Sequence, residues 1–234
     1  MNKFETSWVE YASVDDRIVK GYFAKPKQAN ANIPAVIAIH EWWGLNKITI
    51  ADVLRLTEQG YQVLAPDLYY GRVTHDENES QKLMQEVIDN PELAKENLKQ
   101  AYQYLSDRGA AKIGVIGWCF GGSWSLQTAL LFPKELSAAV IYYGTQVGQM
   151  ETKDLEPLEM PILGFFGAED SIIPAPNVRK FQSTLDALGK KARIHIYEGV
   201  GHAFADPTDD RYNPEITATA WSETVEFLAR NLQS

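Results

Sequence analysis

The sequence predicts a doubly wound α/β fold whose mostly parallel sheet is preceded by an N-terminal antiparallel hairpin. Trp8–Ala12 and Ile18–Ala24 flank Asp15-Asp16, which indicates the hairpin. From residue 35 onward, short apolar segments alternate with helical patterns, as is typical of buried parallel strands joined by crossover helices. These segments are Ala35–Ile39, Gln62–Ala65, Lys112–Gly117, Ala138–Tyr143, Ile162–Phe166 and Ala192–Tyr197.

Two of the intervening helices carry clear start signals. Asn90 precedes Pro91, and Asn213 precedes Pro214, so each asparagine can cap a helix that has proline at its first position. The polar, acidic segment from Thr74 to Ser80 is expected to be a solvated loop. With no repeat and no Pro/Gly-rich linker, we expect residues 1–234 to form one domain.

Composition excludes several classes of function. The chain of 234 residues has a net charge of −9, which disfavours nucleic acid and anionic membranes as partners. No apolar segment reaches the ~18 residues of a membrane span. Glu5 stands where a signal peptide would need an apolar core, and a single cysteine excludes an internal disulfide. We therefore expect a cytoplasmic protein.

The most informative motif surrounds that cysteine. The strand Lys112–Gly117 leads into Gly117-x-Cys119-x-Gly121, and an apolar helical segment follows. This pattern is that of the nucleophile elbow of α/β-hydrolases, with Cys in place of Ser. Glycine at both flanking positions avoids backbone collisions in the sharp turn. Cys119 would then lie at a helix N-terminus, which favours a thiolate. The alternative is a small buried hydrophobic residue.

A nucleophile of this kind needs an acid and a base further along the chain, in that order. Of the four histidines, His202 lies in a glycine-rich loop just after the last predicted strand, where a base is expected. Asp170 follows the strand Ile162–Phe166 and can orient His202, with Glu169 as the competing acid. The alternative for His202 is a loop histidine that caps a turn, and the alternative for Asp170 is a cap of the helix that begins near Pro174.

A second carboxylate, Glu41, follows the strand Ala35–Ile39 in His40-Glu41-Trp42-Trp43-Gly44. The segment is not a zinc-protease motif, because glycine replaces its second histidine, and we expect no metal. Backbone N–H groups of this turn could form half of an oxyanion hole, the other half coming from the N–H after Cys119. Aromatic residues near the motifs would line an apolar pocket or belong to the core: Trp42, Trp43, Trp118, Phe120, Tyr143 and Phe204.

Taken together, these motifs resemble the dienelactone hydrolase (carboxymethylenebutenolidase-like) family over nearly the whole chain. The matching segments are His40-Glu41-x-x-Gly44-Leu45, Ala65–Tyr69, Gly117-x-Cys119-x-Gly121-Gly122, Tyr142–Gly144, Asp170-x-x-x-Pro174 and Gly201-His202-x-Phe204. The resemblance implies an α/β-hydrolase fold, a monomer and no cofactor. It also implies a catalytic site of Cys119, His202 and Asp170, a buried Glu41 that holds the thiol proton, and an oxyanion hole from the N–H groups of Phe120 and Trp42.

The substrate pocket departs from that family. Family members that act on the dienelactone use two arginines for its carboxylate. Arg72 is the candidate for one, or else a surface arginine paired with nearby acids; Trp43, Tyr143 and Phe204 are further substrate-contact candidates. Asp206 replaces the second arginine, and Ala203 replaces the serine beside the histidine. We therefore expect weak binding of carboxylates.

The sequence thus predicts a hydrolase of small carboxylic esters or lactones that forms a thioester on Cys119. A thioesterase or other acyl transferase would use the same three side chains. A thiol that serves redox sensing or binding in a non-enzyme is the third hypothesis. The natural substrate and the pathway stay open.

Overall fold

The computed structural model describes residues 3–28 and 32–234. Residues 1–2, which belong to the N-terminal segment where no signal peptide is expected, and residues 29–31 lie outside the described residues. The chain divides into two compact units, Met1–Val115 and Ile116–Ser234. Within the described ranges, no helix combines the length and the apolar character that crossing a membrane requires.

The first unit contains the hairpin and the first parallel strands. Its strand order is β1-β2-β4-β3, with β1 and β2 antiparallel, β2 and β4 antiparallel, and β3 and β4 parallel. The hairpin turns at Asp15 and Asp16, which both have left-handed backbones. The elements are β1 (Phe4–Val14), β2 (Arg17–Pro26), β3 (Ala35–Ile39), α1 (Lys47–Glu58), β4 (Gln62–Ala65), α2 (Glu77–Asp89) and α3 (Pro91–Asp107).

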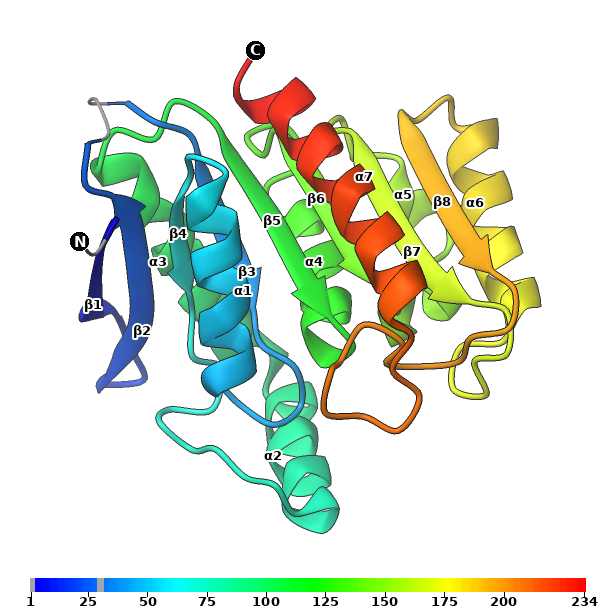
Figure 1. Ribbon diagram of the computed structural model, residues 1–234, viewed down its shortest axis with the longest axis horizontal. Coiled ribbons are helices and arrows are strands. Elements are labelled where there is room, and N and C mark those ends of the chain that lie inside the picture. Colours follow the sequence, from blue (N-terminus) through cyan, green and yellow to red (C-terminus); the bar gives the residue numbers. More distant parts are fainter. Residues whose placement is uncertain (1–2, 29–31) are drawn as a thin grey trace. The chain divides into compact units, whose positions relative to one another are not determined.

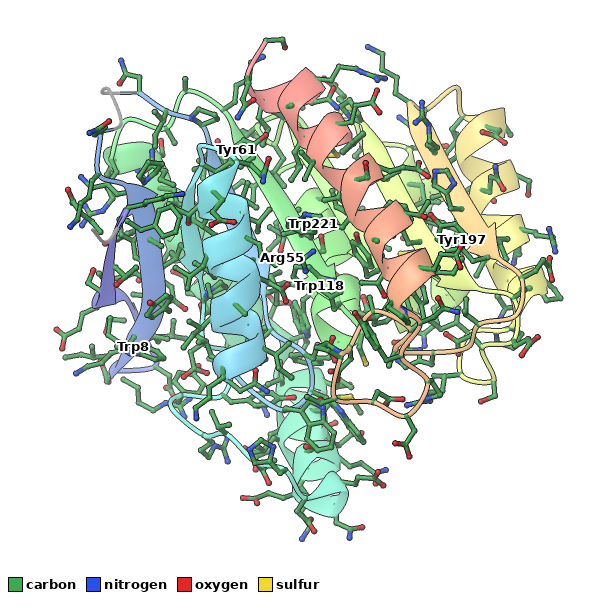
Figure 2. The ribbon with its side chains drawn as sticks, viewed as in Figure 1. Trp8, Arg55, Tyr61, Trp118, Tyr197 and Trp221 are labelled. Carbon is green, nitrogen blue, oxygen red and sulfur yellow. The ribbon has the colours of Figure 1, made fainter. Side chains whose placement is uncertain are left out.

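Helices cover both faces of the strands in this unit. In Figure 1, α1 lies in front of β3 and β4 while α3 lies behind them. All five residues of β3 and all four of β4 are buried, as expected for strands covered on both sides. Trp8 and Tyr61 are labelled in Figure 2: Trp8 is half exposed on β1, whereas Tyr61 is fully buried just before β4.

The second unit continues the α/β pattern. Its strands β6, β7 and β8 are mutually parallel in that order. Helix α7 lies in front of β6 and β7, whereas α4 and α6 lie behind the strands of this unit (Figure 1). The elements are α4 (Phe120–Leu131), β6 (Ala138–Tyr142), η1 (Thr145–Gln149), α5 (Thr152–Leu155), β7 (Ile162–Gly167), α6 (Ala175–Ala187), β8 (Ala192–Tyr197) and α7 (Pro214–Leu232). Strand β5 (Ile113–Trp118) begins in the first unit and ends in the second.

The predicted fold class is confirmed, and two local predictions are wrong. The segment from Thr74 to Ser80 is not all loop, because α2 begins at Glu77 behind the capping side chain of Asp76, and Ser80 is buried. Asn90 does not cap α3 with its side chain, which instead donates to the carbonyl of Glu86. Asn213 does cap α7, accepting from the Ile216 N–H at 3.0 Å.

Candidate active site

Cys119 occupies a strained turn between β5 and α4. Its backbone is left-handed (φ 53°), a conformation that is uncommon for a residue other than glycine. The turn is fixed because the Cys119 N–H donates to the Tyr142 carbonyl and the Cys119 carbonyl accepts from Ser123. A Cβ at Gly117 would lie 2.0 Å from the Gly121 carbonyl oxygen, so only glycine fits there. The nucleophile elbow predicted from the sequence is therefore present.

The second unit brings three predicted site residues together. Sγ of Cys119 lies 3.1 Å from Nε2 of His202, and Nδ1 of His202 lies 2.8 Å from Oδ2 of Asp170. His202 and Asp170 are almost completely buried, whereas Cys119 is partly exposed. Sulfur is thus the accessible end of a buried chain of hydrogen bonds. This arrangement suits a thiol that attacks an electrophile while imidazole takes its proton.

Asp170 is held so that one oxygen serves His202. Its Oδ1 accepts from the N–H groups of Ile172 and Ile173 at 2.8 and 2.9 Å, which leaves Oδ2 for the imidazole. Because a carboxylate only accepts, Nδ1 of His202 donates to it and Nε2 faces the thiol as an acceptor. The competitor Glu169 is exposed, whereas Asp170 is the carboxylate that His202 contacts.

Aromatic side chains pack behind the base. Tyr143 meets the His202 ring edge-to-face at 5.1 Å, and Phe204 meets Tyr143 at 5.3 Å. Both are fully buried, which favours the core interpretation over contact with substrate. Tyr143 and Ala203 have positive φ, so backbone strain gathers beside His202 as well as at Cys119.

The predicted Glu41 turn belongs to the first unit. Its carbonyl accepts from the Gly44 N–H at 3.2 Å, and the rings of Trp42 and Trp43 lie 4.7 Å apart. Glu41, Trp42 and Trp43 are all partly exposed. Gly44 has φ +89°, and a Cβ there would lie 2.4 Å from the Arg72 carbonyl oxygen. The turn is therefore shaped by glycine and lies directly against the chain at Arg72.

The guanidinium of Arg72 is engaged by protein groups. It donates from Nε to the Tyr69 carbonyl at 3.1 Å and forms a forked ion pair with Glu86, with distances of 3.2 and 2.5 Å. The hydrogen bond to Glu86 is the main reason that the pKa of Arg72 lies above its usual value. These contacts favour the surface-pair interpretation of Arg72 over a free carboxylate clamp.

Asp206, which stands where the family has an arginine, is a turn residue. Its buried carboxylate accepts from the backbone and hydroxyl groups of Thr208 at 2.8 and 2.7 Å. Sequence reasoning missed Arg211, whose charge interacts favourably with Cys119 and Asp170. The Arg211 guanidinium also donates two hydrogen bonds to the Asp209 carboxylate, and this contact is the main reason that the pKa of Arg211 is raised. It lies nine residues after His202, with no motif that could have indicated it.

Sequence reasoning also missed two buried groups in the first unit. His40 is fully buried and makes hydrogen bonds with the Glu41 carbonyl at 2.6 Å and the Leu68 N–H at 3.1 Å. Asp67 accepts from the N–H groups of Tyr69 and Gly71 and so holds the turn that follows β4. Both residues lie within sequence motifs, but their hydrogen-bond partners are evident only from the folded structure. In the ranges described, no cluster of three His, Cys, Asp or Glu residues could hold a metal ion.

The chain is similar over most of its length to proteins of one family. The model of the "Dienelactone hydrolase family" matches residues 19–232. "Protein usf" of Aquifex pyrophilus is 31% identical over 224 residues, covering 92% of this chain and 94% of that protein. A protein of Aquifex aeolicus named "Putative carboxymethylenebutenolidase" is 29% identical over 225 residues, with the same coverage. The crystal structure titled "Putative Dienelactone Hydrolase" from Klebsiella pneumoniae has a TM-score of 0.87 at 25% identity, covering 98% of this chain and 100% of that one.

Proposed function

We propose how this chain, which belongs to the dienelactone hydrolase family, performs its reaction. As a member of that family it is a hydrolase of esters or lactones. In our proposal it acts through a Cys119-His202-Asp170 triad and a thioester intermediate. The observation that carries the proposal is the continuous contact from Sγ of Cys119 through His202 to Asp170, at 3.1 and 2.8 Å. Its expected substrate is a small, neutral ester or lactone.

The chemistry follows from the protonation states. Nε2 of His202 accepts the thiol proton as Sγ of Cys119 bonds to the substrate carbonyl carbon. When the tetrahedral intermediate collapses, the carbon–oxygen bond of the leaving group breaks, and His202 returns the proton to the departing alcohol. Water then loses a proton to His202 and attacks the thioester, which releases the carboxylic acid and restores the thiol. Asp170 stabilises the imidazolium in both halves.

Two backbone donors are assigned to the developing oxyanion. The N–H of Phe120 is at the first residue of α4, where the positive end of the helix dipole favours negative charge. The N–H of Trp42 is the second donor, by likeness to the family. Glu41 is proposed, again by likeness to the family, to accept a hydrogen bond from the thiol before substrate arrives, so that the proton stays on sulfur until His202 takes it.

Replacement of the nucleophile tests this proposal. We expect Cys119→Ala to lower kcat on a chromogenic short-chain ester by more than about 10³-fold, because the triad acts as a unit. Because Cys119 is the one cysteine of the chain, a mass increase of one acyl group that appears in the intact wild type and not in Cys119→Ala marks the thioester. Turnover by the folded Cys119→Ala protein at the wild-type rate, or an acyl group on another residue, would refute the mechanism.

The proposal treats residues 1–234 as one catalytic domain that acts as a cytoplasmic monomer without a cofactor. The family match over residues 19–232 supports a single catalytic domain, because it spans both compact units. Size-exclusion chromatography with light scattering should give a mass near 26.3 kDa for the active species. Activity confined to a larger species, or lost on dialysis against chelator, would contradict it.

A further inference from the structure

His40 links two turns of the first unit, one after β3 and one after β4. Its side chain is fully buried, and each ring nitrogen meets a backbone group. The Leu68 N–H can only donate, so Nε2 accepts, and the single proton of the neutral ring lies on Nδ1. Nδ1–H then donates to the Glu41 carbonyl. Burial lowers the pKa of His40 and so favours this neutral form, against the opposing effect of Asp67.

The acceptor of that hydrogen bond belongs to a peptide group with a proposed catalytic role. The Glu41 carbonyl and the Trp42 N–H are the two ends of one planar peptide unit, so they point in opposite directions. A hydrogen bond that fixes the carbonyl therefore also fixes the direction of the N–H. It also polarises the peptide and makes the N–H a stronger donor.

We propose that His40 is a positioning residue for the oxyanion hole: its Nδ1–H donates to the Glu41 carbonyl and thereby aims the Trp42 N–H, while the Leu68 N–H that Nε2 accepts supports the ring. The inference rests on the proposed function, because Trp42 is assigned there as an oxyanion donor. The turn after β4 is itself rigid, since Asp67 accepts from Tyr69 and Gly71 and its N–H donates to the Tyr11 hydroxyl. His40 therefore anchors the oxyanion peptide to a fixed support.

Two conservative substitutions separate the two hydrogen bonds. The amide nitrogen of asparagine is bonded to Cγ, as is Nδ1 of histidine, so His40→Asn keeps a donor for the Glu41 carbonyl. The amide group of glutamine lies one bond further out, so His40→Gln keeps an acceptor for the Leu68 N–H and loses the donor to Glu41. The exposed His75 provides the matched control, His75→Gln.

The test is steady-state ester hydrolysis, with kcat expressed per folded molecule, counted by near-ultraviolet circular dichroism. We expect His40→Gln to lower kcat about 10- to 100-fold with KM changed less than about twofold, since removal of an oxyanion donor costs 10²–10³ and misalignment costs less. His40→Asn should keep kcat within about fivefold of wild type, and His75→Gln should not change it. A residue that merely supports folding would reduce the folded fraction but not kcat per folded molecule.

Other results would overturn the inference. Wild-type kcat in His40→Gln, or equal losses in His40→Asn and His40→Gln, would refute the positioning role while Cys119→Ala still abolishes turnover. If Cys119→Ala is as active as wild type, the proposed function fails instead. The wild type gives a further check that needs no variant: ¹⁵N chemical shifts of the His40 ring must show a protonated Nδ1 and a bare Nε2. The opposite tautomer would refute the proposal even if His40→Gln does not fold.

Discussion

A single carboxylate oxygen decides the orientation of His202. Because Oδ1 of Asp170 is occupied by the N–H groups of Ile172 and Ile173, Oδ2 alone faces the imidazole. We expect Asp170→Asn to lower kcat about 10²- to 10⁴-fold, because an amide N–H facing His202 would favour the wrong tautomer. The measurement is ester turnover per folded molecule. The neighbouring Glu169→Gln is the matched control and should leave kcat unchanged, whereas equal losses would reassign the acid.

At the level of residues, the sequence motifs predicted which side chains form the candidate site, but they did not predict which groups those and other side chains contact. Cys119, His202 and Asp170 were identified because each directly follows a strand, and the carboxyl ends of parallel strands meet at one edge. The engagement of Arg72 by Glu86, and the proximity of Arg211 to Cys119, depend on how loops fold back. No periodicity reports such contacts, so the specificity residues could not be settled from the sequence.

The elbow between β5 and α4 is an element in which two backbone segments nearly touch. A methyl group at Gly117 would meet the Gly121 carbonyl at 2.0 Å, and backbone cannot move aside as a flexible side chain does. We expect Gly117→Ala to lower the free energy of unfolding by more than about 3 kcal/mol, or to prevent folding. Urea unfolding followed by tryptophan fluorescence measures this loss.

Gly199 provides the comparison for that substitution. It has φ +76° but open space where a Cβ would lie. Gly199→Ala should therefore lower the free energy of unfolding by about 1 kcal/mol, the cost of a left-handed backbone for alanine. Gly117 has the opposite combination, with crowding and no positive φ. If the two variants lose equal stability, steric contact is not what requires glycine in the elbow.

The ends of β3 and β4 should make stability depend on pH through His40. Burial lowers its pKa in the folded protein below the ordinary value of 6.5, so the unfolded chain binds a proton first as pH falls. The free energy of unfolding is therefore greatest above pH 6.5 and decreases as pH falls below it. His195 contributes in the same direction, since burial also lowers its pKa.

The variant His40→Asn isolates that contribution. Urea unfolding at pH 7.0 and pH 5.5 should show a smaller decrease in His40→Asn than in wild type, while His75→Gln should match wild type. An identical decrease in all three proteins would mean that His40 takes up a proton as readily when folded as when unfolded.

Element boundaries show where local sequence information was sufficient. The hairpin and the buried strands followed from apolar patterns and agree closely with β1 to β8. Helix α2 was missed at its start because Thr74–Ser80 is polar, yet Asp76 caps the helix and Ser80 is buried by tertiary packing. Local composition indicates solvent exposure only on average, and the packing of α2 overrides it.

For the whole molecule, charge bears on which substrates are accepted. The net charge of −9 repels anions, Asp206 replaces a cation, and Arg72 is engaged by Glu86. We expect a neutral ester to have a kcat/KM at least about tenfold higher than an ester of equal length that ends in a carboxylate, at low salt. Arg211, the cation near Cys119, acts in the opposite direction, so Arg211→Gln should widen the difference.

Salt separates repulsion by the whole molecule from a pocket that merely lacks a partner for the carboxylate. The screening length falls from about 10 Å at 0.1 M to about 3 Å at 1 M, so distant charges stop acting while contacts persist. If net charge sets the preference, the ratio of neutral to anionic kcat/KM should shrink towards one in 1 M NaCl. If the missing arginine sets it, the ratio should stay nearly constant. A strong preference for the carboxylate-bearing substrate at any salt concentration would contradict both explanations. It would require a cation of the protein, such as Arg72, to leave its ion pair and contact the substrate.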